Sequence, residues 1–414
     1  MRALKFLIVM SSRPKILLSC YACEPNKGSE PEVGWRVAQG AVDYADVTVL
    51  TRSNNQETID ASKESTEGIN FLYFDLPRVF RVLKKKGILG VGLYYVLWQI
   101  AARIWLRERI KNFDLVHHVT FNGFQFPGAW WGIDQPILLG PLGGGMVFPP
   151  DMLGSLGSGL SKERLRTAIV RSFKWNPFWM SYLRSADRVL GANVETAKLL
   201  ESVRGGEVEM MLETGYEVSG ERAKVHDEGG SCEVLWVGGL ISRKCPVMAI
   251  EIAERVLKND VDFEMTIIGD GPMMGELRAL IREKKLESYI RLTGKIPKEE
   301  VERRMEKADV FLFTSMRDTS GNVLLEAMAR ELPLVVPKHQ GAALICSDEH
   351  AVLIDVVNPE QFVEQAAAGI MKLAKDQGLR KRMGVEGKRR LETNFSWNRY
   401  HSRMKCIYEE ILGR

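Results

Sequence analysis

The sequence predicts an α/β protein built from two doubly wound domains in tandem. Its 414 residues exceed the size at which one hydrophobic core usually stops growing, so two domains of about 200 residues each are expected. Short apolar runs alternate with helical patterns along the chain, which is typical of parallel sheets covered by helices. The predicted strands are also too numerous for one open sheet, since such sheets rarely exceed about 10 strands.

The first half begins with a strand, helix and strand. A strand at Lys15–Cys20 leads through a loop into a helix that contains Val33 and Val37, and a second strand follows at Asp46–Thr51. Connections of this kind produce neighbouring parallel strands. Further strands are predicted at Phe71–Leu76, Leu115–Val119, Ile137–Leu139, Arg188–Ala192 and Val208–Leu212. The first half is therefore predicted to form a doubly wound sheet.

A polar, glycine-containing stretch at residues 217–230 separates the two halves. We therefore expect a first domain over residues 1–216 and a second domain over residues 231–395. The second half repeats the alternation, and its strands are predicted at Val234–Val237, Met265–Ile268, Ile290–Thr293 and Val310–Phe313. Its helices are predicted at Pro246–Leu257, Met273–Lys284 and Lys298–Lys307, followed by one that begins near Asn322.

Charge and cysteine content exclude several classes of protein. The 57 basic residues nearly balance the 53 acidic ones, so the net charge gives no reason to expect a nucleic-acid partner. Six scattered cysteines fit a reducing compartment better than a disulfide scaffold, and the pair Cys20 and Cys23 lacks the further ligands of a zinc site. The apolar run at residues 3–10 is too short to cross a bilayer. We expect a cytoplasmic protein without a bound metal.

The strongest chemical signal follows the strand at Val310–Phe313. A polar loop with Asp318 and Gly321 leads to a helix that begins near Asn322 and carries Glu326 about one turn in. Free N–H groups at a helix start favour an anion such as a diphosphate. The two carboxylate oxygens of Glu326 can accept hydrogen bonds from two ribose hydroxyls. The alternative is that Asp318 caps the helix and Glu326 is an ordinary solvated residue.

Two other loops carry glycines or cations directly after predicted strands. The glycine run that ends at Gly145 exposes backbone N–H groups, which suits either a phosphate contact or a flexible turn. Arg243 and Lys244 lie at the start of a helix, where cations are unfavourable unless an anion lies between them and the helix. They are either phosphate contacts or an ordinary surface pair.

Two histidines, His117 and His118, end another strand at the sheet edge where ligands bind in open α/β folds. They are either hydrogen-bonding substrate contacts or a structural pair.

The stretch Arg78–Lys111 combines basic and aromatic residues. It holds nine basic residues opposed only by Glu108, together with an apolar segment that contains Tyr94, Tyr95 and Trp98. Lysines beside an aromatic-rich amphipathic segment suit the anionic inner face of a membrane. The alternative is a buried helix with a solvated basic end.

Taken together, these segments resemble the family 4 glycosyltransferases, which are retaining enzymes of the GT-B fold, with two Rossmann-like domains facing a central cleft. The family signature is an acidic residue that is followed, after seven further residues, by Glu-Ala-Met-Ala. In this sequence the acidic residue is Asp318, and the Glu is Glu326. Its Gly-Arg-Leu and Lys-Gly pattern corresponds to Gly238-Gly239-Leu240 and Lys244, with Gly239 in place of the arginine. The resemblance covers nearly the whole chain and is more specific in the second half.

The resemblance also implies the functional residues. The implied catalytic residues are His117, His118, Asp318 and Glu326. The implied donor-binding residues are Gly28, Ser29, Gly143, Gly144, Gly145, Gly238, Arg243, Lys244, Gly294, Lys295, Ser320, Gly321, Asn322 and Val323. The C-terminal helix over residues 396–414 is expected to pack back onto the first domain.

The implied reaction moves a hexose-like sugar from a UDP- or GDP-type sugar nucleotide to a saccharide or lipid-linked acceptor. It proceeds with retention by front-face attack, in which the leaving phosphate helps to take the acceptor proton. Neither a metal nor another cofactor is needed, because cations, loop amides and helix N-termini neutralise the diphosphate. We expect a role in cell-envelope polysaccharide or glycolipid synthesis, with peripheral attachment to the inner face of the membrane. Because Gly239 stands in place of the expected arginine, one alternative is that the protein is a non-catalytic partner subunit that binds a sugar nucleotide. A GT-B-like epimerase or phosphorylase is a further alternative.

Overall fold

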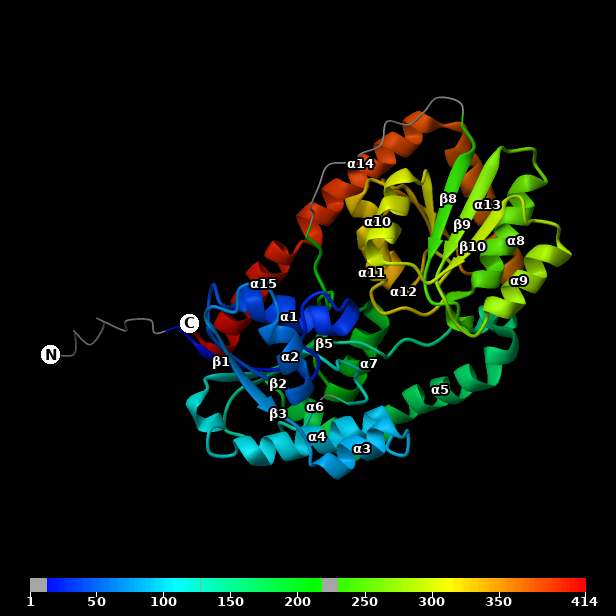
Figure 1. The fold of residues 1–414 in the computed structure, drawn as a ribbon. Coiled ribbons are helices and arrows are strands. Elements are labelled where there is room, and N and C mark those ends of the chain that lie inside the picture. Colours follow the sequence, from blue (N-terminus) through cyan, green and yellow to red (C-terminus); the bar gives the residue numbers. More distant parts are fainter. Residues whose placement is uncertain (1–12, 127, 218–229) are drawn as a thin grey trace.

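Two parallel β-sheets organise the computed structural model of the protein, which describes residues 13–126, 128–217 and 230–414 (Figure 1). The apolar run at residues 3–10 and most of the predicted linker, residues 218–229, lie outside these residues. The prediction of two doubly wound α/β sheets is confirmed.

The first sheet has seven strands within the described part of the chain, in the order β3-β2-β1-β4-β5-β6-β7. The strands are β1 (Lys15–Ser19), β2 (Asp46–Arg52), β3 (Ile69–Phe74), β4 (Leu115–His118), β5 (Ile137–Leu142), β6 (Arg188–Gly191) and β7 (Glu209–Met210). Its helices are α1 (Ser29–Ala41), α2 (Gln56–Asp60), α3 (Arg78–Lys85), α4 (Val91–Leu106), α5 (Leu160–Ser172), α6 (Pro177–Ser185) and α7 (Val194–Arg204). Strand order reverses between β1 and β4, which makes this the point where ligands bind in such sheets.

The second sheet has six strands among the described residues, in the order β10-β9-β8-β11-β12-β13. The strands are β8 (Cys232–Val237), β9 (Phe263–Ile268), β10 (Ile290–Gly294), β11 (Val310–Leu312), β12 (Leu334–Pro337) and β13 (Ala351–Ile354). Its helices are α8 (Pro246–Leu257), α9 (Met274–Glu283), α10 (Lys298–Lys307), α11 (Asn322–Ala329), α12 (Gln340–Ile345), α13 (Pro359–Lys375) and α14 (Gln377–Asn394). Here the order reverses between β8 and β11. We call the first sheet with its covering helices the first unit, and the second sheet with its covering helices the second unit.

Both sheets are buried on their two faces. Ile16, Leu17 and Leu18 of β1 and Val234 and Leu235 of β8 are fully buried, as expected where helices cover both sides of a parallel sheet. Burying one such side chain contributes about 1.5–3 kcal/mol. The central strands therefore hold the carboxyl ends of both sheets in fixed positions.

Side-chain caps define where several helices begin. Asn193, Asn358 and Ser396 each accept a hydrogen bond from a backbone N–H in the first turn of the helix that follows them, which is α7, α13 and α15 (Trp397–Leu412) respectively. Such a cap stabilises a helix by about 1 kcal/mol.

The last helix, α15 (Trp397–Leu412), belongs to the core of the first unit. Tyr400, Met404, Ile407 and Tyr408 pack in one buried cluster with β1 and α1. In Figure 1 this red helix lies beside the blue elements, far from the second sheet that precedes it in sequence.

A segment of the first half packs into the second unit, which the sequence did not indicate. This segment is the short helix η3 (Pro150–Gly159) with the residues just before it. Its side chains Phe148, Met152 and Leu156 lie in the same buried cluster as Trp236 and Met248. Helix α5 then leads back to the first unit (Figure 1). The chain therefore crosses between the units more than once.

Within the described ranges, every helix is too short or too polar to cross a bilayer.

Candidate functional site

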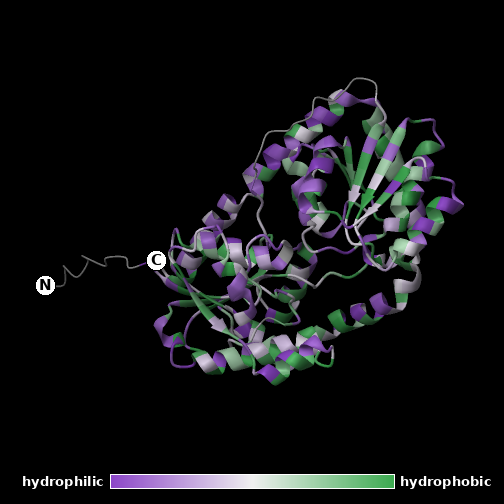
Figure 2. Ribbon diagram, viewed as in Figure 1, coloured by the Kyte–Doolittle hydropathy of each residue, from purple (hydrophilic) through white to green (hydrophobic). Residues whose placement is uncertain are grey.

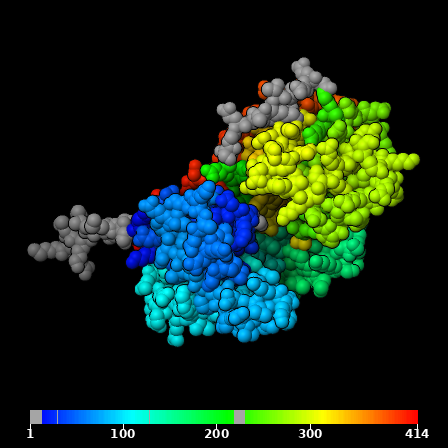
Figure 3. Space-filling view, viewed as in Figure 1, coloured from blue at the N-terminus to red at the C-terminus, as the bar shows by residue number. Residues whose placement is uncertain are grey.

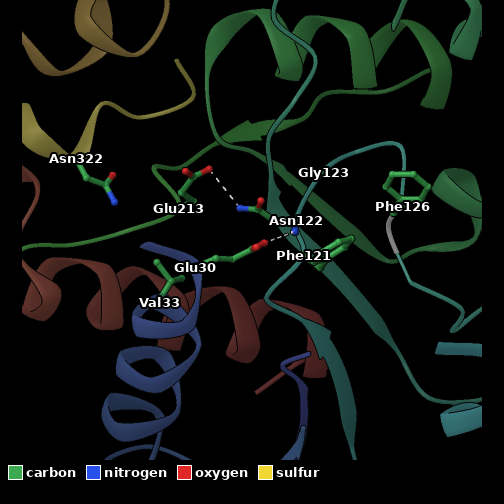
Figure 4. Close-up of a pocket in the computed structure, with 8 residues that line it drawn as sticks. All are labelled: Glu30, Val33, Phe121, Asn122, Gly123, Phe126, Glu213 and Asn322. Atoms are coloured by element: carbon green, nitrogen blue, oxygen red, sulfur yellow. Dashed lines mark hydrogen bonds between the residues drawn. The ribbon is translucent and has the colours of Figure 1, made fainter. Parts of the chain in front are cut away.

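A cavity of about 410 Å³ opens between the two units. It is lined by Glu30, Val33, Phe121, Asn122, Gly123, Phe126, Glu213 and Asn322 (Figure 4). Figure 3 shows the hollow between the blue first unit and the yellow second unit.

The topology explains why these residues meet. Glu30 opens α1 directly after β1, and Asn122 lies in the loop after β4, so both come from the reversal point of the first sheet. Glu213 follows β7. Asn322 is the first residue of α11, which follows β11 at the reversal point of the second sheet. The cavity therefore lies where the ligand-binding edges of the two sheets face each other.

Glu213 is held by residues of both units. Its Oε2 accepts a hydrogen bond from Nδ2 of Asn122 at 3.2 Å, and its Oε1 accepts one from the Ser320 hydroxyl at 3.0 Å. The pKa of Glu213 is raised to about 7, mainly because burial disfavours the charged form, although the Ser320 hydrogen bond opposes the shift. A carboxyl group with this pKa exchanges its proton near neutral pH, as a general acid or base must.

Glu30 is a second carboxylate on the same cavity wall. Its Oε1 accepts a hydrogen bond from the backbone N–H of Asn122 at 3.0 Å. Burial raises its pKa, while the backbone N–H groups of Asn122 and Phe121 lower it. Asn122 therefore contacts both carboxylates, Glu213 through its side chain and Glu30 through its backbone (Figure 4).

The loop before α11 lies beside two cations. The Asp318 carboxylate lies 3.4 Å from Nζ of Lys244 and 3.7 Å from a guanidinium nitrogen of Arg243. The backbone N–H of Asp318 donates to Oε1 of Gln340, whose Nε2 donates to the Val147 carbonyl of the first unit at 2.8 Å. This loop is therefore tied to both cations and to the other unit.

Glu326 is half-buried on α11. Burial raises its pKa, and the positive charges of Lys298, Arg330 and Lys244 act in the opposite direction. Lys244 is therefore near enough for its charge to act on Glu326. The structure thus brings three predicted residues, Lys244, Asp318 and Glu326, into one neighbourhood.

The glycine run after β5 forms a contact between the units. A Cβ on Gly143 would lie 2.7 Å from a Thr319 methyl carbon of the second unit, and a Cβ on Gly145 would lie 2.8 Å from the Thr196 backbone. Gly144 has φ +89° and accepts a hydrogen bond from Arg166. Gly143 therefore lets the loop with Thr319 approach closely. The role of the three glycines in donor binding stays a prediction.

His117 and His118 lie away from the cavity, both fully buried. Nε2 of His117 is 2.7 Å from the Gly140 carbonyl, which can only accept, so Nε2 carries the proton and Nδ1 accepts from the Tyr408 hydroxyl at 2.8 Å. Burial lowers the pKa of His117 to about 4 and that of His118 to about 3. The geometry gives His117 a structural role in place of the predicted catalytic one.

His118 is similarly enclosed, with its Nε2 3.2 Å from the Tyr95 hydroxyl. The loop after β4 lines the cavity with Phe121, Asn122, Gly123 and Phe126 instead, and Asn122 carries the polar side chain among them.

The remaining predicted residues occupy sheet edges and helix starts. Gly28, with φ +63°, precedes α1, and Ser29 is the first residue of that helix. Gly238 lies against the Lys244 side chain, and a Cβ on Gly239 would lie 4.0 Å from the Asp270 carbonyl oxygen. Gly294 and the exposed Lys295 end the edge strand β10. Ser320 is buried, and the next residues Gly321, Asn322 and Val323 form the start of α11.

Sequence reasoning missed Asn122 and Glu213. Asn122 follows the strand that holds the two histidines, so a search of strand ends could have found it. Glu213 follows β7, which is only two residues long. No local pattern distinguishes this carboxylate from a surface residue.

Among the described residues, no cluster of three or more His, Cys, Asp or Glu side chains is arranged to hold a metal ion. The charges that face the cleft are carboxylates on the first unit and a mixture of cations and a carboxylate on the second. This arrangement can bind an anionic group on one side and hydroxyl groups on the other.

Comparisons with known proteins find similar glycosyltransferases. Residues 220–390 match the family described as Glycosyl transferases group 1. The chain is 31% identical over 185 residues to the amylovoran biosynthesis glycosyltransferase AmsK of Erwinia amylovora, covering 43% of this chain and 44% of AmsK. It is 26% identical over 184 residues to the lipopolysaccharide core biosynthesis glycosyltransferase LpsE of Rhizobium meliloti, covering 44% of this chain and 51% of LpsE. The match thus spans about half the length of these curated relatives.

The fold comparison extends over the whole chain. The HepE protein of Anabaena, solved in complex with UDP and glucose, aligns with a TM-score of 0.61 and 14% identity, over 96% of this chain and 99% of that chain. The protein therefore has the GT-B fold.

Proposed function

We propose that the protein is a retaining, metal-independent glycosyltransferase of family 4. It transfers a hexose-like sugar from a UDP- or GDP-type sugar nucleotide to a saccharide or lipid-linked acceptor, in the synthesis of a cell-envelope polysaccharide or glycolipid. The group 1 glycosyltransferase match in the second unit and the names of the relatives support the reaction class and the pathway type.

The observation that carries the proposal is the cavity between the two reversal points. Its second-unit wall is the start of α11, where free backbone N–H groups favour a diphosphate. Lys244 and Arg243 lie at the neighbouring loop and supply positive charge. Glu326, half-buried on the same helix, is suited to accept hydrogen bonds from two ribose hydroxyls.

Glu213 supplies a proton acceptor on the acceptor side of the cavity. In the proposed step the bond between the sugar C1 and the diphosphate oxygen breaks, and its electron pair leaves with the diphosphate. The acceptor oxygen bonds to C1 on the same face. Its proton passes to the Glu213 carboxylate, in place of the leaving phosphate to which the resemblance assigns it. Lys244 and the N-terminus of α11 stabilise the charge that develops on the leaving diphosphate.

We also propose that the first unit attaches to an anionic membrane surface through helices α3 and α4. Val79 on α3 and Ile104 on α4 are 66% and 69% exposed, and Trp105 is also exposed. Basic residues Arg81, Lys85 and Lys86 are exposed on and just after α3. In Figure 2 green and purple residues alternate along this edge of the molecule. Basic residues beside exposed apolar ones are typical of a membrane-surface helix.

The test is a screen of sugar nucleotides for binding and for transfer, with Glu326→Gln as the key variant. We expect Glu326→Gln to weaken nucleotide binding by about tenfold to a hundredfold in calorimetry, because a hydrogen bond to a charged group is worth about 1.5–3 kcal/mol. Glu364→Gln, which changes an exposed carboxylate on α13, is the matched control.

The outcomes separate the candidate functions. Unchanged nucleotide affinity in Glu326→Gln rejects the donor-site assignment. Binding without turnover of any donor, with a full set of acceptors, favours the non-catalytic partner subunit, for which Gly239 is the motivating observation. Turnover with inverted configuration rejects the retaining mechanism.

A further inference from the structure

A second cavity, of about 580 Å³, lies between α5 of the first unit and the loop that joins β8 to α8 in the second. It is lined by Leu156, Ser158, Gly159, Lys162, Glu163, Leu165, Arg166, Ile169, Ile241, Ser242, Arg243, Pro272 and Arg317. The donor-site residues Lys244 and Glu326 are not in this lining.

Positive charge is concentrated in the lining of this cavity. Lys162, Arg166, Arg243 and Arg317 are opposed there by Glu163 as the single carboxylate among the described lining residues. Glu163 is largely occupied, because its Oε1 lies 2.8 Å from Nε of Arg317 and 3.9 Å from a nitrogen of Arg166. Asp318 is outside this lining and pairs with both Arg243, at 3.7 Å, and Lys244, at 3.4 Å. The cavity wall therefore carries more positive than negative charge.

The structure holds these cations in place. Arg166 donates to the carbonyls of Met146 at 2.7 Å and Gly144 at 2.8 Å. Arg243 donates to the carbonyl of Arg317 at 2.6 Å. Like charges fixed together in this way repel one another, and the pKa of Arg166 is lowered to about 10 by burial and by the neighbouring Arg317 and Arg243. An anion between them would remove that repulsion.

The other part of the lining is apolar and leads to the outer surface of α5. Leu165 and Ile169 line the cavity and are 64% and 46% exposed. Leu156, Ile241 and Pro272 are the other apolar residues of the lining. The cavity is therefore amphipathic, because its lining combines cations with apolar side chains, two of which are exposed.

We propose that this cavity binds a phosphate group joined to an apolar chain, and that it holds the phosphate of a lipid-linked acceptor beside the donor loop. The proposal rests on the proposed function and specifies the acceptor class for that reaction. The acceptor fits better than the donor because five of the thirteen lining residues come from α5, which carries none of the predicted donor residues, and Arg243 is the one predicted donor residue in the described lining. Arg243 and Arg317 precede or adjoin the loop with Asp318, so a phosphate bound here lies next to the predicted sugar position.

The test measures binding of monodecyl phosphate, below its micelle concentration, to the full chain by calorimetry, with inorganic phosphate and UDP or GDP as separate ligands. Lys162→Gln removes an exposed cation, and Lys162→Gln with Arg166→Gln removes two. We expect the single variant to weaken decyl phosphate binding about fivefold and the double variant at least about tenfold, since each removes a partly solvated charge contact. Arg164→Gln, an exposed cation on the same helix outside the cavity lining, should leave binding unchanged.

Each outcome decides the proposal. If decyl phosphate does not bind the wild-type chain, or binds the Lys162→Gln chain as tightly, the proposal is wrong. If inorganic phosphate binds as tightly as decyl phosphate, the cavity recognises a phosphate without a lipid. If UDP or GDP competes for the cavity and loses affinity equally in Lys162→Gln, the cavity belongs to the donor. Decyl phosphate binding in a chain that transfers no sugar overturns the proposed function and leaves this site standing.

Discussion

Glu213 connects the two units at the scale of a single residue. It follows the last strand of the first sheet, yet one of its oxygens accepts a hydrogen bond from Ser320 in the donor loop of the second. The Ser320 hydroxyl also lies 2.6 Å from Oδ1 of Asn322, so the network continues to the start of α11. A change in the charge of Glu213 therefore affects both the cavity and the contact between the units.

The pH dependence of transfer tests the role of Glu213 as proton acceptor. The pKa of its carboxyl group is raised to about 7, so the group is charged above this pH and neutral below it. We expect kcat to fall as the pH drops through about 7, and Glu213→Gln to lower kcat by roughly 10²–10⁴ and remove this acidic limb. Measurement of kcat from pH 5 to pH 9 in the wild type and in Glu213→Gln checks the acidic limb and its loss. Calorimetry of nucleotide binding to both chains accompanies it.

The neighbouring carboxylate provides the control for that experiment. Glu30→Gln should keep the acidic limb, because the Glu213 carboxyl group is still present. A Glu213→Gln chain that retains the same limb would show that another group titrates. Partial recovery in Glu213→Asp would separate proton transfer from a role in packing.

Helices α3 and α4 divide their side chains between core and surface. Tyr94, Tyr95 and Trp98 are buried under the sheet. Lys84 turns inward, where its Nζ donates to the Tyr21 hydroxyl at 3.0 Å and lies over the Tyr94 ring. Burial lowers the pKa of Lys84. Lys84 is therefore not one of the exposed cations of this stretch, which are the basic residues near it.

Membrane attachment is predicted to depend on the exposed cations of this element. We expect replacement of Arg81, Lys85 and Lys86 by Gln to weaken binding to vesicles with anionic lipid on the order of a hundredfold, at about 1 kcal/mol per basic residue near the surface. Co-sedimentation with vesicles of phosphatidylserine and phosphatidylcholine measures this. Added salt should weaken wild-type binding as well.

A matched triple variant shows whether position matters. Arg278, Arg282 and Lys285 are exposed on or just after α9 of the second unit, and their replacement by Gln removes the same charge. Equal loss in both triple variants would indicate a general charge effect and would reject α3 and α4 as the attachment surface.

At the scale of the whole molecule, the chain end completes the first unit. Tyr408 of α15 is buried in the cluster with β1, and its hydroxyl donates to His117. The isolated bridge between Tyr216 and Ser396 places two of the chain segments that pass between the units side by side. The first unit is therefore incomplete without residues that follow the second sheet.

Stability should depend on α15 accordingly. We expect Tyr408→Ala to lower the free energy of unfolding of the first unit by about 3–5 kcal/mol, because it leaves a cavity in the core. Tyr408→Phe keeps the ring and leaves Nδ1 of His117 unpaired, which costs about 1–3 kcal/mol. Urea unfolding followed by circular dichroism measures both.

The exposed neighbour Cys406 serves as the control on the same helix, since Cys406→Ser should leave the transition unchanged. If Tyr408→Ala unfolds at the same urea concentration as the wild type, α15 does not contribute to the first unit's stability.

The sequence by itself determined the sheet class, most strand positions and the residues around Asp318 and Glu326. These features are local, since apolar runs mark buried parallel strands and a strand end followed by a helix start marks an anion site. The site assignments remain predictions, and Lys244, Asp318 and Glu326 are those that the structure gathers together.

Only the tertiary structure decided which residues of the first unit face the cleft. It buried His117 against Tyr408, placed Asn122 and Glu213 on the cavity, and carried residues 148–156 into the second unit. These placements depend on contacts between residues that are far apart in the chain, such as the 107 positions between Glu213 and Ser320. A local pattern contains no information about such pairs, because burial and the pKa of a carboxyl group depend on what the rest of the chain packs around it.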